Sequence, residues 1–158
     1  MKNIFEKLGK TGTAISVFLG IVAAVITCWQ AYKIYSRHNI AGAWKLKFVV
    51  VSSSYKAYEG DIHTQRVSFC QNECEISGDG EKWEYNGELL DFDKHRKLEY
   101  KGALDDDCLK ATYKLFGKLR ESSGDIVVTL SEDGKKMKGT FIGTAADSRG
   151  TVEGERID

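Results

Sequence analysis

Residues 109–115 read LKATYKL and residues 126–141 read IVVTLSEDGKKMKGTF, and these two stretches decide the fold. In both, apolar side chains alternate with polar or smaller ones at a period of two, which places them on one face of a β-strand. Between two such segments, Ser131-Glu132-Asp133-Gly134 puts glycine where a hairpin turn requires a positive φ. The stretch therefore predicts antiparallel strands joined by a tight turn.

The same alternation extends towards both ends of the region after residue 39. Trp44, Leu46, Phe48 and Val50 share one side of a first strand. Further strands are expected at residues 63–70, 75–77, 82–92, 96–103, 136–143 and 150–157, with a turn at Gly78-Asp79-Gly80. About eight strands at spacings of roughly ten residues form an antiparallel meander. Closure into a barrel removes the exposed edges and leaves an interior for side chains or one small ligand. A β-sandwich is the alternative.

Residues 11–32 contain no Asp, Glu, Lys, Arg or Pro. A helix of that length crosses a hydrocarbon core of about 30 Å. Trp29, Tyr32 and Tyr35 follow at the end where aromatic rings favour the membrane interface. We expect an uncleaved transmembrane anchor within residues 1–38 and a separate β-barrel domain over residues 39–158. A buried soluble helix and a cleaved signal peptide are the alternatives, but no A-x-A site ends the run.

Small residues recur every fourth position in this run, at Gly12, Ser16, Gly20 and Ala24. Such a row lies along one side of a helix and lets two backbones approach closely in lipid. It predicts a helix-association face and a homo-oligomer. The simpler interpretation is that Gly, Ala and Ser are common in membrane spans.

Charge and cysteine content limit the possible partners. Five of the 23 basic residues and one of the 23 acidic residues precede residue 39, so the barrel region has a net charge of −4. This is not the footprint of a DNA- or RNA-binding domain. Cys70 and Cys74 could form a disulfide in an oxidising compartment, but free thiols in a reducing one are preferred. The three histidines have no ligand spacing, so neither a metal site nor a cofactor is expected.

Two residues at the ends of the barrel region indicate closure. Gly42-Ala43-Trp44 is a G-x-W at the start of the first strand, and Arg156 lies in the last. This is similar to lipocalin-like barrels, in which a basic side chain caps that tryptophan. The resemblance implies a guanidinium stacked on an indole, a contact worth about 0.5–2 kcal/mol, and a structural role for both residues.

A small barrel behind an N-terminal span resembles the membrane-anchored β-barrel effectors of bacterial cyclic-oligonucleotide anti-phage signalling (CBASS). The resemblance includes the glycine-punctuated C-terminal third, with Gly124, Asp133-Gly134-Lys135, Gly139-Thr140-Phe141-Ile142-Gly143 and Gly150-Thr151-Val152-Glu153-Gly154. It implies that a cyclic di- or oligonucleotide binds the barrel, that several copies assemble, and that their spans disrupt the bacterial inner membrane. Many members of that group have two predicted spans, whereas this sequence shows one, so we expect a single-pass protein. Charges flanking the span do not fix its orientation, and the resemblance implies a cytosolic barrel.

Nucleotide binding requires aromatic rings for the bases and cations for the phosphates. The candidate ligand contacts are Arg66, Trp83, Tyr85, Tyr100, Tyr113, Thr140, Arg149 and Thr151. The four aromatic residues are expected to point inward, where aromatic side chains also simply fill cores. Enzymatic chemistry has little support, since no P-loop, zinc motif or nucleophile elbow is present. A lipocalin-like carrier of an apolar ligand and a protein-docking scaffold are the alternatives to the effector.

Overall fold

The structure is a computed structural model that describes residues 20–29, 38–117 and 121–157. The chain divides into two compact units, residues 1–37 and residues 38–158. In the first unit, residues 20–29 form a helix whose residues are all exposed. Among the described residues, no helix has both the length and the apolar character needed to cross a bilayer. The predicted span over residues 11–32 extends beyond the described helix at both ends, and Gly12 and Ser16 lie outside the described residues.

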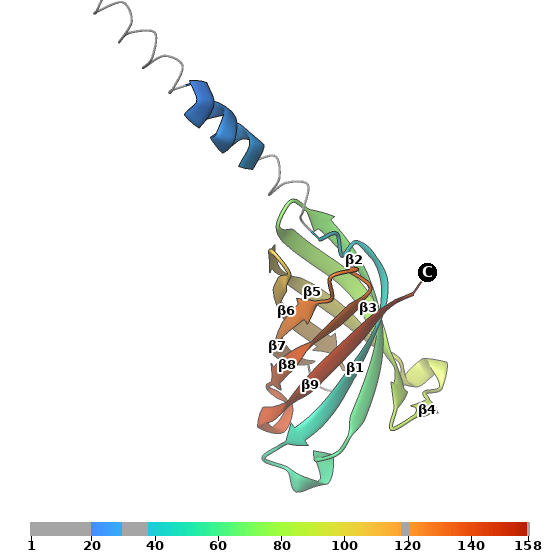
Figure 1. Cartoon of the computed structure of the whole chain (residues 1–158). Helices are drawn as coiled ribbons and strands as arrows, with labels where there is room; N and C mark the ends of the chain where they lie inside the picture. Colours follow the sequence, from blue (N-terminus) through green and yellow to red (C-terminus); the bar gives the residue numbers. More distant parts are fainter. Residues whose placement is uncertain (1–19, 30–37, 118–120, 158) are drawn as a thin grey trace, which may run out of the picture. The chain divides into compact units, whose positions relative to one another are not determined.

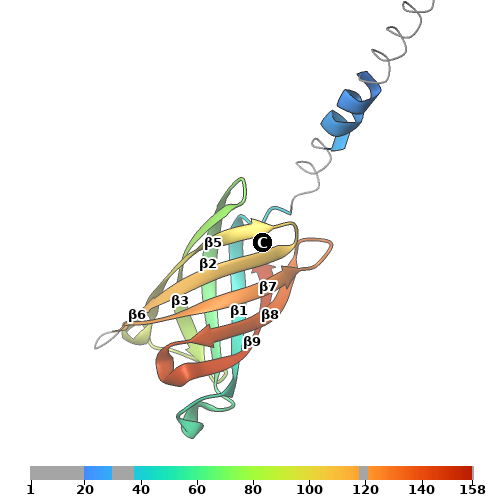
Figure 2. The same cartoon turned by 90° about the vertical axis from the view of Figure 1, so that its left-hand side faces the viewer.

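The second unit is all-β, as predicted (Figures 1 and 2). Its strands are β1 (Gly42–Ser52), β2 (Ile62–Asn72), β3 (Glu75–Tyr85), β4 (Glu88–Leu89), β5 (Arg96–Asp105), β6 (Cys108–Phe116), β7 (Glu121–Leu130), β8 (Lys136–Gly143) and β9 (Ser148–Ile157). Short 3-10 helices lie at η1 (Lys56–Tyr58), η2 (Phe92–Lys94) and η3 (Ala145–Asp147).

Eight of these strands close into an antiparallel barrel. The order is β2-β1-β9-β8-β7-β6-β5-β3, and pairing of β2 with β3 completes the circle. The short strand β4 pairs only with β3 and projects beside the barrel (Figure 1). The β2–β3 pairing confirms the predicted barrel over the alternative sandwich. It also removes the two unpaired edges that an open sheet would have.

One predicted turn is wrong. Gly78-Asp79-Gly80 lies inside β3, so residues 75–77 and 82–85 belong to one strand. Gly78 and Gly80 face the interior, and a Cβ added to Gly80 would stand 2.3 Å from the carbonyl oxygen of Arg66. These glycines are therefore required for close strand packing and do not form a turn. The chain turns instead at Asn86 and Gly87, which have φ values of 50° and 84°.

The expected hairpin at residues 131–134 is confirmed. Gly134 has a φ of 63°, and its amide donates a hydrogen bond of 2.8 Å to the carbonyl of Ser131. The amide of Ser131 donates to the carbonyl of Lys136 at 2.9 Å. Glycine thus fills the position that the sequence pattern assigned to it.

The barrel is plugged at the end where its first strand begins. Trp44 of β1 pairs in register with Arg156 of β9, and the guanidinium lies 5.2 Å from the indole centroid. The Trp44 side chain is fully buried and donates a hydrogen bond of 2.8 Å to the carbonyl of Ile40. Arg156 donates to the carbonyls of Ala41, at 3.1 Å, and of Asn39. The contact expected from the G-x-W pattern is therefore present, and it seals this end.

Candidate functional site: a cavity at the open end of the barrel

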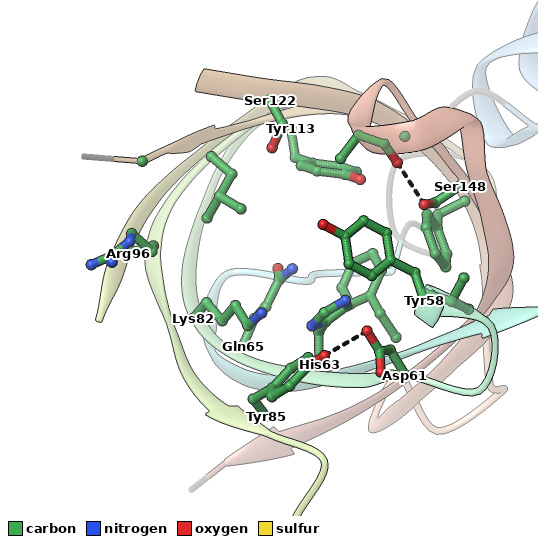
Figure 3. A pocket seen from close by; sticks show the side chains of 17 residues that line it. Tyr58, Asp61, His63, Gln65, Lys82, Tyr85, Arg96, Tyr113, Ser122 and Ser148 are labelled. Atoms are coloured by element: carbon green, nitrogen blue, oxygen red, sulfur yellow. Dashed lines mark hydrogen bonds between the residues drawn. The ribbon is translucent and has the colours of Figure 1, made fainter. Parts of the chain in front are cut away.

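The other end of the barrel contains a cavity of about 380 Å³ (Figure 3). The end of β1, the start of β2, the end of β3 and the start of β9 all contribute to it, so it lies opposite the Trp44–Arg156 plug. Its polar lining includes Tyr58, Asp61, His63, Gln65, Lys82, Tyr85, Tyr113, Ser122 and Ser148. A volume of this size is near the lower end of the range for small-molecule sites, about 300–1,000 Å³.

The floor of the cavity is apolar and aromatic. Phe48 makes edge contacts with Tyr113 and Phe141, with ring centroids 5.9 Å and 5.2 Å apart. Glycines make room for the Tyr113 ring, because a Cβ on Gly124 or Gly143 would stand 2.6 Å or 2.8 Å from its hydroxyl oxygen. The glycine-rich C-terminal third thus has a packing function: it lets one tyrosine lie flat across the barrel interior.

A carboxylate with fixed partners lies at the rim. Asp61 accepts hydrogen bonds from the Tyr85 hydroxyl at 2.6 Å and from the Asn86 amide at 3.2 Å. Burial works to raise the Asp61 pKa, but these hydrogen bonds and the nearby charges of His63 and Lys82 bring the pKa below its usual value. The same hydrogen bond raises the pKa of Tyr85 to about 12. Asp61 is therefore an ionised, positioned acceptor at neutral pH.

A lysine projects into the barrel from β3. The β2–β3 register pairs Gln65 with Lys82 but Thr64 with Glu84, so Trp83 is an extra residue in a β-bulge. The bulge lets both Lys82 and Tyr85 line the cavity although they are three residues apart. The Lys82 ammonium lies 4.5 Å from the centroid of the Tyr85 ring. Within the described residues, no carboxylate stands within 4.0 Å of it.

Burial dominates the electrostatics of the two basic side chains inside the cavity. It lowers the pKa of Lys82 to about 8; Arg96 also lowers this pKa, and Asp61 opposes the shift. Burial and the charge of Lys82 lower the pKa of His63 to about 4, so this imidazole is neutral at pH 7. His63 stacks on Tyr85 with a centroid separation of 5.2 Å, and its buried Nδ1 has no hydrogen-bond partner among the described residues.

Arg96 stands at the rim. Its guanidinium donates to the carbonyls of His95, at 2.8 Å, and of Asp93, at 3.2 Å. Figure 3 shows the guanidinium turned away from the cavity, towards the outside of the wall. Lys82 is thus the cation inside the cavity, and Arg96 adds positive charge from the rim.

The structure brings together only some of the predicted ligand contacts. Tyr85 and Tyr113 line the cavity. Tyr100 is buried beneath it and donates a hydrogen bond to the side-chain oxygen of Gln65, itself a lining residue. These three aromatic residues point inward as expected.

The other five predicted contacts do not line the cavity. The inward orientation predicted for Trp83 is wrong. Trp83 follows the inward Lys82 and lies on the outer wall, where the exposed Arg66 stacks on it with its guanidinium carbon 4.5 Å from the ring centroid. Thr140 and Thr151 are exposed partners on β8 and β9. Arg149 is exposed on the same wall.

Residues missed by sequence reasoning provide most of the polar lining. His63 and Gln65 continue the inward face of Val67 and Phe69, so the alternation could have identified them. Lys82 follows Gly78 and Gly80 on the same face, but the expected turn there concealed the pattern. Tyr58 comes from η1, outside any strand, and no periodic signal marks it (Figure 3).

Within the described residues, no group of His, Cys, Asp and Glu side chains could hold a metal ion. Cys28, Cys70, Cys74 and Cys108 are all free thiols. His95 contacts Glu81 at 2.9 Å and the carbonyl of Leu90 at 3.1 Å, and it does not line the cavity.

Comparison of the chain with protein-family models, with curated proteins and with solved structures returned no match. The assignment of function therefore depends on the fold and on the chemistry of the cavity.

Proposed function

We propose that this protein is a membrane-anchored sensor whose barrel binds a small anionic ligand with a planar ring, of which a nucleotide second messenger is the best fit. The observation that carries the proposal is Lys82, an amine held inside an aromatic cavity without a carboxylate within 4.0 Å among the described residues. Removing a cation from water is costly unless it is paired. Asp61 adds negative charge to the same cavity from beyond 4.0 Å, and a bound phosphate would supply a partner in direct contact.

The ring-binding surface lies beside that amine. Tyr85, Tyr113 and Tyr58 line the same cavity, and His63 stacks on Tyr85. Aromatic side chains bind nucleobases by stacking, at about 1–3 kcal/mol per base. The cavity of about 380 Å³ suits a single nucleotide unit, so a cyclic dinucleotide would place one unit inside and its second at the rim, near Arg96.

The sequence resemblance adds an effector role to this sensor. In this effector role, ligand binding favours formation of a homo-oligomer, and association of the N-terminal helices disrupts the bacterial inner membrane during phage infection. The barrel would lie in the cytosol behind a single-pass anchor. The support for association is the small-residue row itself, of which Gly20 and Ala24 lie on the described helix and are exposed, like its other residues.

Thermal unfolding of the full chain in detergent tests the sensor. The ligands are 3′,3′-cyclic GMP–AMP, cyclic di-AMP, AMP and palmitate, each added to wild type, Lys82→Met and the control Lys110→Met, whose lysine is exposed on β6. At about 100 times its Kd, a ligand stabilises the folded protein by about 2.7 kcal/mol. We expect a nucleotide to raise the Tm of wild type and of Lys110→Met but not of Lys82→Met. Equal shifts in all three proteins, or no shift with any nucleotide, would contradict the proposal.

The effector role has a separate test in cells that carry the full chain and its inducing nucleotide. A Cβ added to Gly20 meets no described atom within 4 Å, so we use Gly20→Ile to probe contacts between copies. We expect growth arrest to be lost while the nucleotide-dependent Tm shift of the purified variant is kept. Ile21→Val, a change at the neighbouring exposed position, serves as the control. If Gly20→Ile still arrested growth fully, the helix face that contains Gly20 would be excluded as the surface of association between copies.

A second candidate function follows from the floor of the cavity. Phe48, Val50, Leu115 and Phe141 give it an apolar base beneath the polar rim. This arrangement also suits an amphipathic anion such as a fatty acid, carried by an anchored lipocalin-like barrel. A Tm shift with palmitate and none with nucleotides would favour that carrier.

A further inference from the structure

The amine of Lys82 differs in its surroundings from the lysines on the outer wall of the barrel. Lys97, Lys114 and Lys138 are each within 3.1 Å of a glutamate oxygen. Lys82 instead faces the Tyr85 ring inside the cavity, and its cross-strand partner on β5 is Arg96, another cation. A desolvated lysine beside a second cation is the arrangement that makes a primary amine nucleophilic.

The protonation state agrees with this geometry. With a pKa of about 8 for Lys82, about one molecule in ten carries the neutral amine at pH 7. At the ordinary lysine pKa of about 10.4, fewer than about one in a thousand would do so. The neutral amine has a lone pair and opens onto a cavity large enough for a small molecule.

We propose that Lys82 is a covalent attachment site, at which its Nζ condenses with the carbonyl carbon of a small aldehyde-bearing anion to form an imine. This reaction would use the same cavity as nucleotide sensing. It goes beyond the proposed function because it does not require a nucleotide ligand. An anion is favoured because Arg96 adds positive charge at the rim and because a protonated imine at Lys82 would itself be a cation.

The step balances without a further reactant. The Nζ lone pair attacks the carbonyl carbon, the two hydrogens of the neutral amine are transferred as protons to the carbonyl oxygen, and that oxygen leaves as water. No group is oxidised or reduced, and the reaction is reversible by hydrolysis. His63 lines the same cavity as a neutral imidazole whose Nδ1 has no hydrogen-bond partner among the described residues, so it is placed to carry protons during formation and loss of water.

Pyridoxal 5′-phosphate, a phosphorylated aldehyde, tests the proposal on the full chain in detergent. Brief incubation at pH 7.5, reduction with borohydride and peptide mass spectrometry measure the labelling rate at each lysine. We expect Lys82 to be labelled at least about tenfold faster than the exposed Lys110 and Lys138, because its neutral fraction is larger. The rate at Lys82 should level off above about pH 8.

Two variants sharpen the test. Arg96→Gln removes a charge that lowers the Lys82 pKa, so labelling of Lys82 should slow while its cavity remains. Lys110→Arg should leave the Lys82 rate unchanged. Labelling of Lys82 no faster than that of Lys110, in a wild-type protein whose circular dichroism shows the β-barrel, would overturn the proposal. That result would leave a nucleotide-dependent Tm shift intact, so the two proposals fail separately.

Discussion

The two ends of the barrel each place a cation against an aromatic ring, but with opposite consequences. At the plugged end, Arg156 lies 5.2 Å from the Trp44 ring and donates to backbone carbonyls. At the open end, Lys82 lies 4.5 Å from the Tyr85 ring beside a cavity. The first cation is held by hydrogen bonds that the chain supplies, whereas the second is available to a ligand. Similar contacts thus stabilise one end and, in the proposed function, provide the ligand site at the other.

The largest effect is expected at the plugged end. Trp44→Ala removes a fully buried indole and leaves the Arg156 guanidinium without its ring. A core Trp→Ala change costs about 3–5 kcal/mol, so the free energy of unfolding in urea should fall by that amount. Trp83→Ala is the matched control, because this half-buried indole lies on the outer wall, and it should cost clearly less. An equal loss of unfolding free energy in the two variants would contradict the claim that Trp44 stabilises the barrel more than a tryptophan on its outer wall does.

A smaller effect of opposite sign is expected at the open end. At pH 7 Lys82 is mostly protonated in both states, so its burial as a cation destabilises the free protein. We expect Lys82→Met to raise the free energy of unfolding by about 1–3 kcal/mol, while Lys110→Met changes it little. A gain in stability together with a loss of ligand binding is typical of a functional site.

The pH dependence of this effect has a definite sign. The pKa of Lys82 is about 8 in the folded protein and 10.5 in the reference state, so the unfolded chain binds more protons between these values. The stability contribution of Lys82 therefore rises as the pH increases from about 8 to 10.5. The advantage of Lys82→Met over wild type should shrink over that window. An advantage that stays constant from pH 7 to 10.5 would show that charge burial is not its cause.

The sequence predicts the strands of the barrel better than it predicts the residues that line the cavity. Strict alternation in residues 109–115, and glycine at position 134, predict strands and a turn that the structure contains. Trp44 and Arg156 could be paired because the first and last strands of a closed meander must be neighbours. Each of these predictions follows from local periodicity or from closure.

The cavity could be predicted only in part, because its composition depends on two departures from regular alternation. The bulge at Trp83 shifts the alternation at the end of β3 by one residue, so Tyr85 lines the cavity although Trp83, two residues earlier, does not. The 3-10 turn η1 brings Tyr58 over the opening from a loop. The side chains of Thr140, Arg149 and Thr151 have the chemistry to bind a phosphate, but their strand parity places them outside the barrel.

The pKa of Lys82 itself tests most directly whether the open end holds a cation for a ligand. It can be measured by NMR of ¹³C-labelled lysine side chains in the full chain, with the Lys82 signal assigned by its absence from Lys82→Met. We predict a pKa of about 8 in the free protein and a higher pKa once 3′,3′-cyclic GMP–AMP is bound, because a phosphate stabilises the ammonium. A pKa near 10.5 that does not change when the nucleotide is added would contradict the central claim.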